Sequence, residues 1–599
     1  MPETAERAPD VRRPLRGAPA EDVHERRRLV ALLAVLAVAI LVVVGVLVLS
    51  GGGETPPSTA AAKVVPSDAL VFLNLSTDGE RNGVKRALAV AGRLPSFGPA
   101  RQALERRFGT RQGPVNFARD VRPWLGNEVA LAVLPTGGQV SQSEIVVDVK
   151  DRAKAESFID RTAGGSGRVE YKGIEIRRYG AVSTAFVAGD LVIAPENVIR
   201  GAIDLSQGRG ANLGKTSLFQ KAYDGLPAGR ALDLFVSRDG VRRLLAPQGG
   251  VFGLAGTLID QPALSAVGGA VTAEGGQAKL TVHTVLDPAL AKATPPGFKP
   301  FTPELLGNVP RGALAYLGVA GLDRAAGRLL GLAGATGVNG ANLSQLAKGA
   351  RATLAKRAGV DIDRDVLSVL RGETALSVLP ALPAPTLALV AQTPNERRTR
   401  VALSKLQVPL ARLFTVPAAG AGQAPTFQER NLDGIDAFQL RLAPTVELDY
   451  AVFDGKLVIS TSLAGIQRVK NVKASLDDDA AFKSVLGNRP STVTSLVFLD
   501  FGQLLALGER TGLRQDPAYL AARDDLSRVR AVGMATTAGK DETTAEIWSA
   551  ILSGWPSVTD SEVNRNSLSE YVVISVRSRS PRSFRPCRSS SPFRRRARD

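Results

Sequence analysis

The sequence has few of the side chains that build disulfides, metal sites and catalytic triads. Among its 599 residues there is one cysteine, Cys587, and there are two histidines, His24 and His283. A single cysteine excludes an intrachain disulfide. Zinc sites draw on several Cys and His ligands, and a Ser-His-Asp mechanism needs a histidine beside its nucleophile. We therefore expect no metal, no cofactor and no triad chemistry.

The longest apolar run is residues 29–49, which follow Arg26, Arg27 and Arg28 without a break. As a helix it would be roughly 31 Å long, about the thickness of the hydrocarbon core of a bilayer. Seven arginines precede the run, and the next positive charge is Lys63. Because basic residues mark the cytoplasmic flank, we predict a signal anchor with residues 1–28 inside as a disordered segment.

Two other interpretations of the apolar run stay open. A cleaved secretory signal usually has a core of about 7–15 residues with its cleavage site close behind. Here the small-residue site Ala60-Ala61-Ala62 begins ten residues beyond Ser50. A buried helix of a soluble protein is the other interpretation. The signal anchor predicts a single-pass protein of the cell membrane whose bulk is extracytoplasmic.

The part of the sequence after the predicted membrane segment contains an internal repeat. Residues 115–135 align without gaps on residues 360–380 and are identical at 11 of 21 positions. Other matches follow in the same order, among them Gly189-Asp190-Leu191-Val192-Ile193 with Gly455-Lys456-Leu457-Val458-Ile459. The sequence therefore predicts a tandem duplication.

Composition places the domain boundaries. Residues 50–63 are rich in small and polar residues and read as a spacer, and residues 287–308 contain five prolines, typical of a semi-rigid linker. The two repeats are then residues 64–286 and 309–552. In each repeat, apolar runs joined by short turns alternate with a few helices. We predict an α+β fold of two tandem homologous domains with largely antiparallel sheets, preceded by one transmembrane helix.

Acidic residues that match between the repeats are the best candidates for chemistry. Asp120 and Glu128 correspond to Asp365 and Glu373. Two carboxylates could act as an acid and base pair, as in glycan hydrolysis. The structural alternative is that the aspartate caps a short helical turn and the glutamate begins a strand. His283 has Trp548 near its matching position, which favours a structural strand residue.

The formal charge of +18 does not indicate nucleic-acid binding, because much of it lies in a short segment at the C-terminal end. Nine arginines and one aspartate fall after Val576, inside residues 553–599. This Arg/Ser-rich tail is predicted to be disordered. It is either an arm for anionic cell-wall polymer or lipid headgroups, or the product of a reading frame lost near Ser553.

The combined pattern resembles the bacterial domain of unknown function 3352 family. The residues that carry the resemblance are Val65–Phe72, Asp120–Gly126, Tyr171–Ile174 and Gly189–Ala194. The resemblance spans roughly residues 64–552 and implies a membrane-anchored or exported envelope protein of bacteria, with no activity to carry over. We predict a non-catalytic module that binds an envelope ligand or protein partner. The alternative is a cell-envelope hydrolase that uses the paired carboxylates.

Overall fold

A computed structural model places most of the chain between Thr55 and Leu552. The residues that it describes are 55–100, 102, 115–136, 142–163, 167–245, 262–293, 298–323, 370–382, 384–413, 426–443 and 446–552. They all belong to one unit, Met1–Ser553. No helix within these ranges is long and apolar enough to span a membrane. The predicted signal anchor, the cytoplasmic segment and the basic tail lie outside the described residues.

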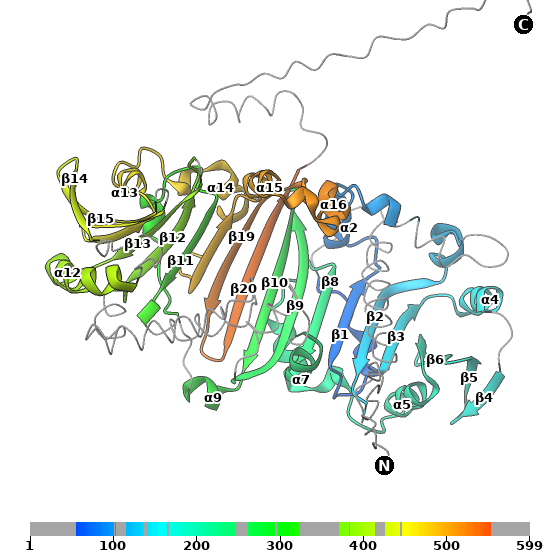
Figure 1. Cartoon of the computed structure of the whole chain (residues 1–599). Helices are drawn as coiled ribbons and strands as arrows, with labels where there is room; N and C mark the ends of the chain where they lie inside the picture. Colours follow the sequence, from blue (N-terminus) through cyan, green and yellow to red (C-terminus); the bar gives the residue numbers. More distant parts are fainter. Residues whose placement is uncertain are drawn as a thin grey trace, which may run out of the picture. The chain divides into compact units, whose positions relative to one another are not determined.

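One antiparallel sheet organises the described residues (Figure 1). We call residues 55–293 the first half and residues 298–552 the second half. The strands of the first half are β1 (Val71–Ser76), β2 (Leu125–Leu134), β3 (Gln142–Val149), β4 (Gly167–Tyr171), β5 (Ile174–Tyr179), β6 (Val182–Val187), β7 (Asp190–Ala194), β8 (Leu232–Ser237), β9 (Leu264–Glu274) and β10 (Gln277–Leu286). Those of the second half are β11 (Ala315–Ala320), β12 (Glu373–Leu379), β13 (Thr386–Gln392), β14 (Gln428–Leu432), β15 (Ile435–Ala443), β16 (Val446–Phe453), β17 (Lys456–Ser460), β18 (Ser495–Leu499), β19 (Val529–Ala538) and β20 (Glu542–Ile551).

Both halves pair their strands in the same order. The first half runs β4-β5-β6-β7-β3-β2-β1-β8-β9-β10. The second half runs β14-β15-β16-β17-β13-β12-β11-β18-β19-β20. The predicted α+β class with antiparallel strands is confirmed. Corresponding positions in the two halves can therefore be read from strand register.

The two halves join edge to edge through their last strands. β10 and β20 pair antiparallel, with Thr281 opposite Glu546 near the middle. Arg93 makes two hydrogen bonds beside this strand pair, to the backbone oxygens of Gly276 (3.0 Å) and Ile551 (2.8 Å). The halves therefore share one continuous sheet, which disfavours a ligand cleft that opens and closes between hinged domains.

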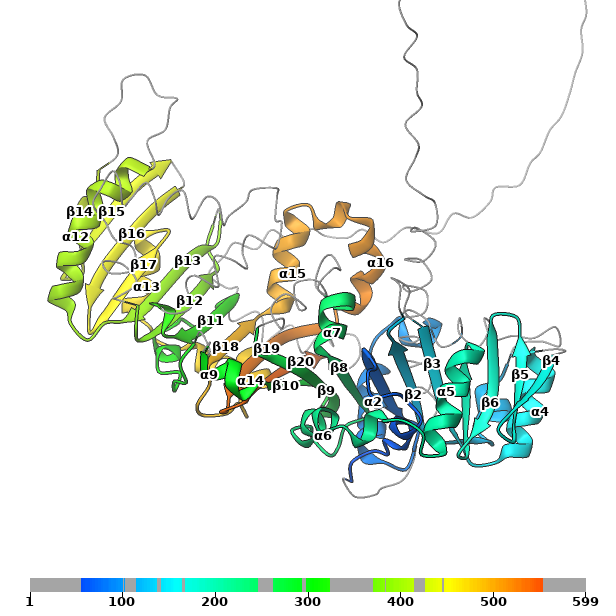
Figure 2. The same ribbon diagram turned by 90° about the horizontal axis from the view of Figure 1, so that it is seen from below.

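Helices cover both faces of the sheet (Figures 1 and 2). In the first half these are η1 (Ala60–Lys63), α2 (Asn82–Ala91), η2 (Phe117–Val121), α4 (Arg152–Ala163), α5 (Glu196–Ser206), η3 (Leu213–Lys215), α6 (Ser217–Asp224), α7 (Arg238–Gly240), η4 (Val241–Leu245) and α9 (Pro288–Ala293). In the second half they are η5 (Leu305–Asn308), α12 (Glu396–Leu413), α13 (Leu463–Lys470), η9 (Leu476–Asp478), α14 (Ala480–Leu486), α15 (Phe501–Arg510), η10 (Leu513–Gln515) and α16 (Pro517–Leu526). Here η marks a short 3-10 or π turn.

Burial on both faces explains the nearly continuous apolar strands. On one face, Ala132 of β2 and Val192 of β7 pack in the same core as Ile199 of α5. On the other, Val147 of β3 packs with Ile159 of α4. A sheet covered on both sides loses the polar-outward alternation of a half-exposed sheet.

The segment before β2 differs from the sequence-based prediction. The helical turn covers Phe117–Val121, and the strand begins at Leu125 with a register shift between Leu125 and Val129. The turn is capped by Asn116, whose side chain accepts from the Arg119 backbone N–H (3.0 Å). Asp120, which we expected to be the cap, lies inside the turn. The expectation assigned the cap four residues too late.

Candidate functional site

The matching glutamates Glu128 and Glu373 perform the same task in both halves. The Glu128 carboxylate accepts from the backbone N–H groups of Ala60 (2.9 Å) and Ala61 (3.0 Å) at the start of η1. Glu373 accepts from Glu304 (2.9 Å) and Leu305 (3.0 Å) at the start of η5. Each carboxylate thereby satisfies free N–H groups of a helical turn that leads toward the first strand of its half.

Burial governs the protonation of both glutamates. It raises the pKa of Glu128 even though two backbone N–H groups oppose the shift. The pKa of Glu373 rises to about 7 for the same reason. Both side chains are almost fully buried. A buried carboxylate whose oxygens accept backbone N–H groups is a structural clamp.

Replacing Glu373 by alanine should destabilise the second half by about 2–3 kcal/mol, because two buried N–H groups lose their acceptor. Glu373→Gln, which keeps one acceptor oxygen, should lose clearly less. Urea unfolding of the two variants measures the difference. A Glu373→Ala variant as stable as the native chain would show that the clamp contributes nothing.

Asp120 is occupied by its own segment. Its carboxylate accepts from the backbone of Asn116 (2.9 Å) and from the Arg119 guanidinium (3.0 Å), which lowers its pKa. None of these partners contacts the Glu128 carboxylate. Asp365, the matching aspartate, lies outside the described residues. Among the described residues, no hydrogen bond joins the carboxylates of Asp120 and Glu128, and each is bonded to a different segment.

A polar clamp holds the segment that enters from the predicted membrane anchor. Asn74 of β1 donates to the backbone oxygen of Ser58 (2.7 Å), and Arg81 donates to that of Thr55 (2.6 Å). Together with Glu128, these side chains hold the backbone from Thr55 to Ala61. The predicted spacer, residues 50–63, is thus bonded to the sheet over its described part.

A buried ion pair lies beneath this clamp. Asp233 of β8 is fully buried and accepts from Arg230 (2.8 Å) and from the Tyr223 hydroxyl (2.8 Å). Asp233 lies directly opposite Asn74 across the β1–β8 pair. Arg230 and Arg81 are linked as well, since Arg81 donates to the Arg230 backbone oxygen (3.0 Å).

Four positions of this cluster carry no polar side chain in the described part of the second half. Strand register matches Asn74 with Gly318 and Asp233 with Leu496. By the same offset, Arg230 matches Val493 and Tyr223 matches Leu486. A Cβ at Gly318 would overlap the Tyr316 hydroxyl, so Tyr316 fills the space of the Asn74 side chain. Glu373 holds η5 as Glu128 holds η1, so the described difference between the halves lies at Asn74 and at the buried ion pair.

Two aspartates that our sequence analysis did not single out lie near Glu128. Asp148 and Asp190 are directly opposite across β3 and β7. Burial, followed by the charges of Asp148 and Glu128, raises the pKa of Asp190 to about 7. The matching residues are Gln392 and Lys456. Because the repeats differ here, a search for matching acids could not find the pair.

Two further carboxylates are buried without a hydrogen-bond partner. Glu144 and Asp449 are both fully buried, and none of their four carboxylate oxygens has a hydrogen-bond partner among the described residues. Burial raises the pKa of Glu144 to about 8 and that of Asp449 to about 7. Their matching positions are Ala388 and Ser183, again a difference between the halves.

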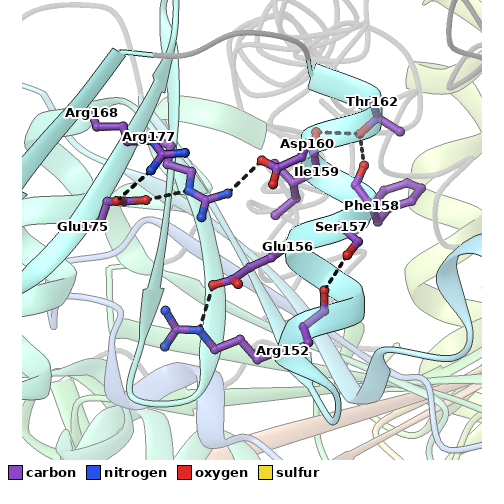
Figure 3. Close-up of polar contacts among 11 residues, drawn as sticks. Arg152, Glu156, Ser157, Phe158, Ile159, Asp160, Thr162, Arg168, Glu175 and Arg177 are labelled. Carbon is purple, nitrogen blue, oxygen red and sulfur yellow. Dashed lines mark hydrogen bonds and ion pairs between the residues drawn. The ribbon is translucent and has the colours of Figure 1, made fainter.

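The exposed face of α4 carries an ion-pair network (Figure 3). Arg152 pairs with Glu156 on the next turn (3.0 Å). Arg177 of β5 pairs with Asp160 of α4 (2.9 Å) and with Glu175 (2.7 Å). These charges neutralise one another at the surface and offer no free group for a ligand.

Within the described ranges, no group of three or more His, Cys, Asp or Glu residues could hold a metal ion. His283 is buried on β10, with Nδ1 3.3 Å from the Thr544 hydroxyl, and Gly268 lies opposite it. Trp548 occupies the corresponding place opposite Gly533. Strand packing accounts for both side chains.

These observations define a class: an α+β protein built on one long antiparallel sheet, with buried carboxylates that act as structural clamps. The chain belongs to the family described as "Protein of unknown function (DUF3352)", whose model matches residues 29–549. The predicted family is confirmed. The match includes the apolar run at its start and stops before the basic tail.

Comparison with other proteins adds little to this assignment. No protein with a curated description matches the chain. Among solved structures, crystal form I of TP0453 is similar over 38% of this chain and 79% of its own, with 12% identity and a TM-score of 0.24. Crystal form III of TP0453 covers 39% of this chain and 85% of its own, with 14% identity and a TM-score of 0.23. At these scores the similarity carries no functional argument.

Proposed function

We propose that this protein is a single-pass membrane protein whose two homologous halves form one extracytoplasmic binding module without enzymatic activity. Residues 29–49 supply the anchor, with Arg26, Arg27 and Arg28 on the cytoplasmic side. Because the family match begins at residue 29, the apolar run belongs to the family's shared sequence. The equal strand orders and the equal tasks of Glu128 and Glu373 support a duplication.

The polar clamp on residues 55–61 is the observation that carries this proposal. Six residue steps separate Leu49 from Thr55, which can span at most about 20 Å when fully extended. Arg81 and Asn74 fix the backbone directly after that. The sheet would therefore be held close to the bilayer with little freedom to swing. Asn74, which matches Gly318 in the second half, gives the anchor-proximal segment a hydrogen bond that the matching position cannot supply.

A binding role fits the polar residues better than hydrolysis does. Asp120 is bonded to its own turn, and Glu128 and Glu373 hold backbone N–H groups. A hydrolase that used these carboxylates predicts that their removal abolishes an activity on cell-wall material and leaves stability unchanged. If the carboxylates only hold backbone N–H groups, their removal should lower stability and abolish no activity on cell-wall material. Since the halves share one sheet that helices cover on both faces, we propose that partners bind on the outer surface of this helical layer.

Topology is testable with reporter fusions to the full chain. A reporter active only outside the cytoplasm, fused after Leu552, should be active, while one fused before Arg26 should be silent. A silent fusion after Leu552, with the protein present in the membrane fraction, would overturn the orientation. Replacing three leucines of the run by arginine should release the protein from the membrane.

Binding is testable by thermal unfolding. A partner that binds the folded state at 100 times its Kd should stabilise it by about 2.7 kcal/mol. A broad screen of envelope polymers and proteins against the detergent-solubilised chain should therefore raise the melting temperature with at least one of them. A screen without any stabilising partner counts against the binding role.

A further inference from the structure

The corresponding helices α4 and α12 differ in how their charges are neutralised. Both follow the third strand of their half, and their N-terminal caps, Asp151 and Asn395, match. In α4, Arg152 pairs with Glu156 (3.0 Å) in the network of Figure 3. Lys154 pairs with Asp151 (2.7 Å). Three basic residues there accompany two acidic ones.

Helix α12 has five basic residues and one acidic residue, Glu396. Glu396 forms an ion pair with Arg400 at 2.8 Å. The matching pair in α4, Arg152 with Glu156, has the two charges in the reverse order. The exposed side chains of Arg397, Arg398 and Lys405 have no ion-pair partner among the described residues. The helix therefore presents three unneutralised positive charges within nine residues.

Two exposed valines lie among these charges. Val401 is 49% exposed and Val408 is 57% exposed. The spacing of Arg397, Val401, Lys405 and Val408 places them along one side of the helix. The opposite side of the helix packs on the sheet, because Leu403 and Leu406 are buried in the core over β16 and β17. We call Arg397, Arg398, Val401, Lys405 and Val408 the α12 face.

We propose that the α12 face docks on a bilayer surface that contains anionic lipid headgroups. Cations bind the phosphates, and apolar side chains between them enter the boundary between headgroups and acyl chains. A soluble polyanion would bind the three positive charges, but it would gain no binding free energy from the two exposed valines. The proposal rests on the membrane anchor proposed above, which attaches the chain to a bilayer.

The test uses the full chain in vesicles. Cys587→Ser removes the native thiol, and Val401→Cys places a single environment-sensitive fluorophore on the α12 face. Ser157→Cys labels the matching position of α4 as the control. Vesicles are either phosphatidylcholine alone or equal parts of phosphatidylcholine and phosphatidylglycerol, each doped with a nitroxide-labelled lipid that quenches the fluorophore at close range.

We expect strong quenching at position 401 only in the anionic vesicles, and none at position 157 in either. Replacing Arg397, Arg398 and Lys405 by serine should weaken the contact at least tenfold, because each charge near an anionic surface is worth about fivefold in binding. High salt should weaken it as well.

Two failures are distinguishable. A chain that does not float with either vesicle contradicts the proposed anchor. A chain that floats with both vesicles but shows no quenching at position 401 overturns the docking of α12. Quenching that is unchanged by the triple serine variant also overturns it. Binding of a soluble polyphosphate through the three cations, without quenching in vesicles, would assign the face to a polymer instead.

Discussion

Replacing Arg230 by valine should destabilise the first half by about 3–5 kcal/mol, because the change leaves the Asp233 carboxylate buried without its cation. Arg230 Nε lies 2.8 Å from Asp233, and both side chains are almost fully buried. The remaining partner, the Tyr223 hydroxyl, supplies one neutral hydrogen bond. The loss should shrink at low pH, where protonation of Asp233 removes the unpaired charge.

The second half supplies the matched control. Its residues Val493 and Leu496 stand where Arg230 and Asp233 stand in the first half. The triple variant Tyr223→Phe, Arg230→Val and Asp233→Leu should recover most of the stability that Arg230→Val alone loses, since replacing a whole buried pair by apolar residues is often neutral. Urea unfolding of both variants decides this. Equal losses in both would contradict the buried-charge argument.

Replacing Glu144 by glutamine should stabilise the protein by about 5 kcal/mol near pH 9 and have little effect near pH 4.5. Burial raises the pKa of Glu144 from 4.5 to about 8. Between those values the unfolded chain carries the ionised carboxylate and the folded chain the neutral acid. Stability contributed by this group is therefore lost as the pH rises from about 4.5 to about 8.

The measurement is the free energy of unfolding between pH 4 and pH 9 for the native chain and for Glu144→Gln. Glu170→Gln, which alters an exposed carboxylate outside the ion-pair network, is the control. Asp449 has the same property in the second half, so the double variant Glu144→Gln and Asp449→Asn should flatten the profile further. An identical pH profile for the native chain and Glu144→Gln would show that the Glu144 carboxyl is not buried as described.

Local pattern in the sequence was enough for several elements. Glu274-Gly275-Gly276 between two apolar runs predicts a hairpin turn. β9 and β10 turn at Gly275-Gly276, both with positive φ. The sequence also predicts a helix around residues 83–91, and α2 covers Asn82–Ala91. These features depend on residues close together in the chain, so they can be read without knowing the fold.

The candidate site was predicted only in part, because pairing decides which side chains meet. Matching acids identified Glu128 and Glu373, and the structure gives both the same task, the capping of η1 and η5. The same search passed over Asp233, Glu144 and Asp449, which have no acidic counterpart in the other half. Their burial follows from strands far apart in the chain, and no local pattern reveals it.

By itself, the sequence determined the family, the antiparallel α+β class and the absence of an intrachain disulfide. Composition, periodicity and internal matches can be read from the order of residues alone. The tertiary structure alone decided that β10 pairs with β20 and makes one sheet of the two halves. It also decided that Asn74 and Arg81 hold the segment after the apolar run. The physical reason is that hydrogen bonds and buried charges join residues distant in sequence, and only their arrangement in space selects the partners.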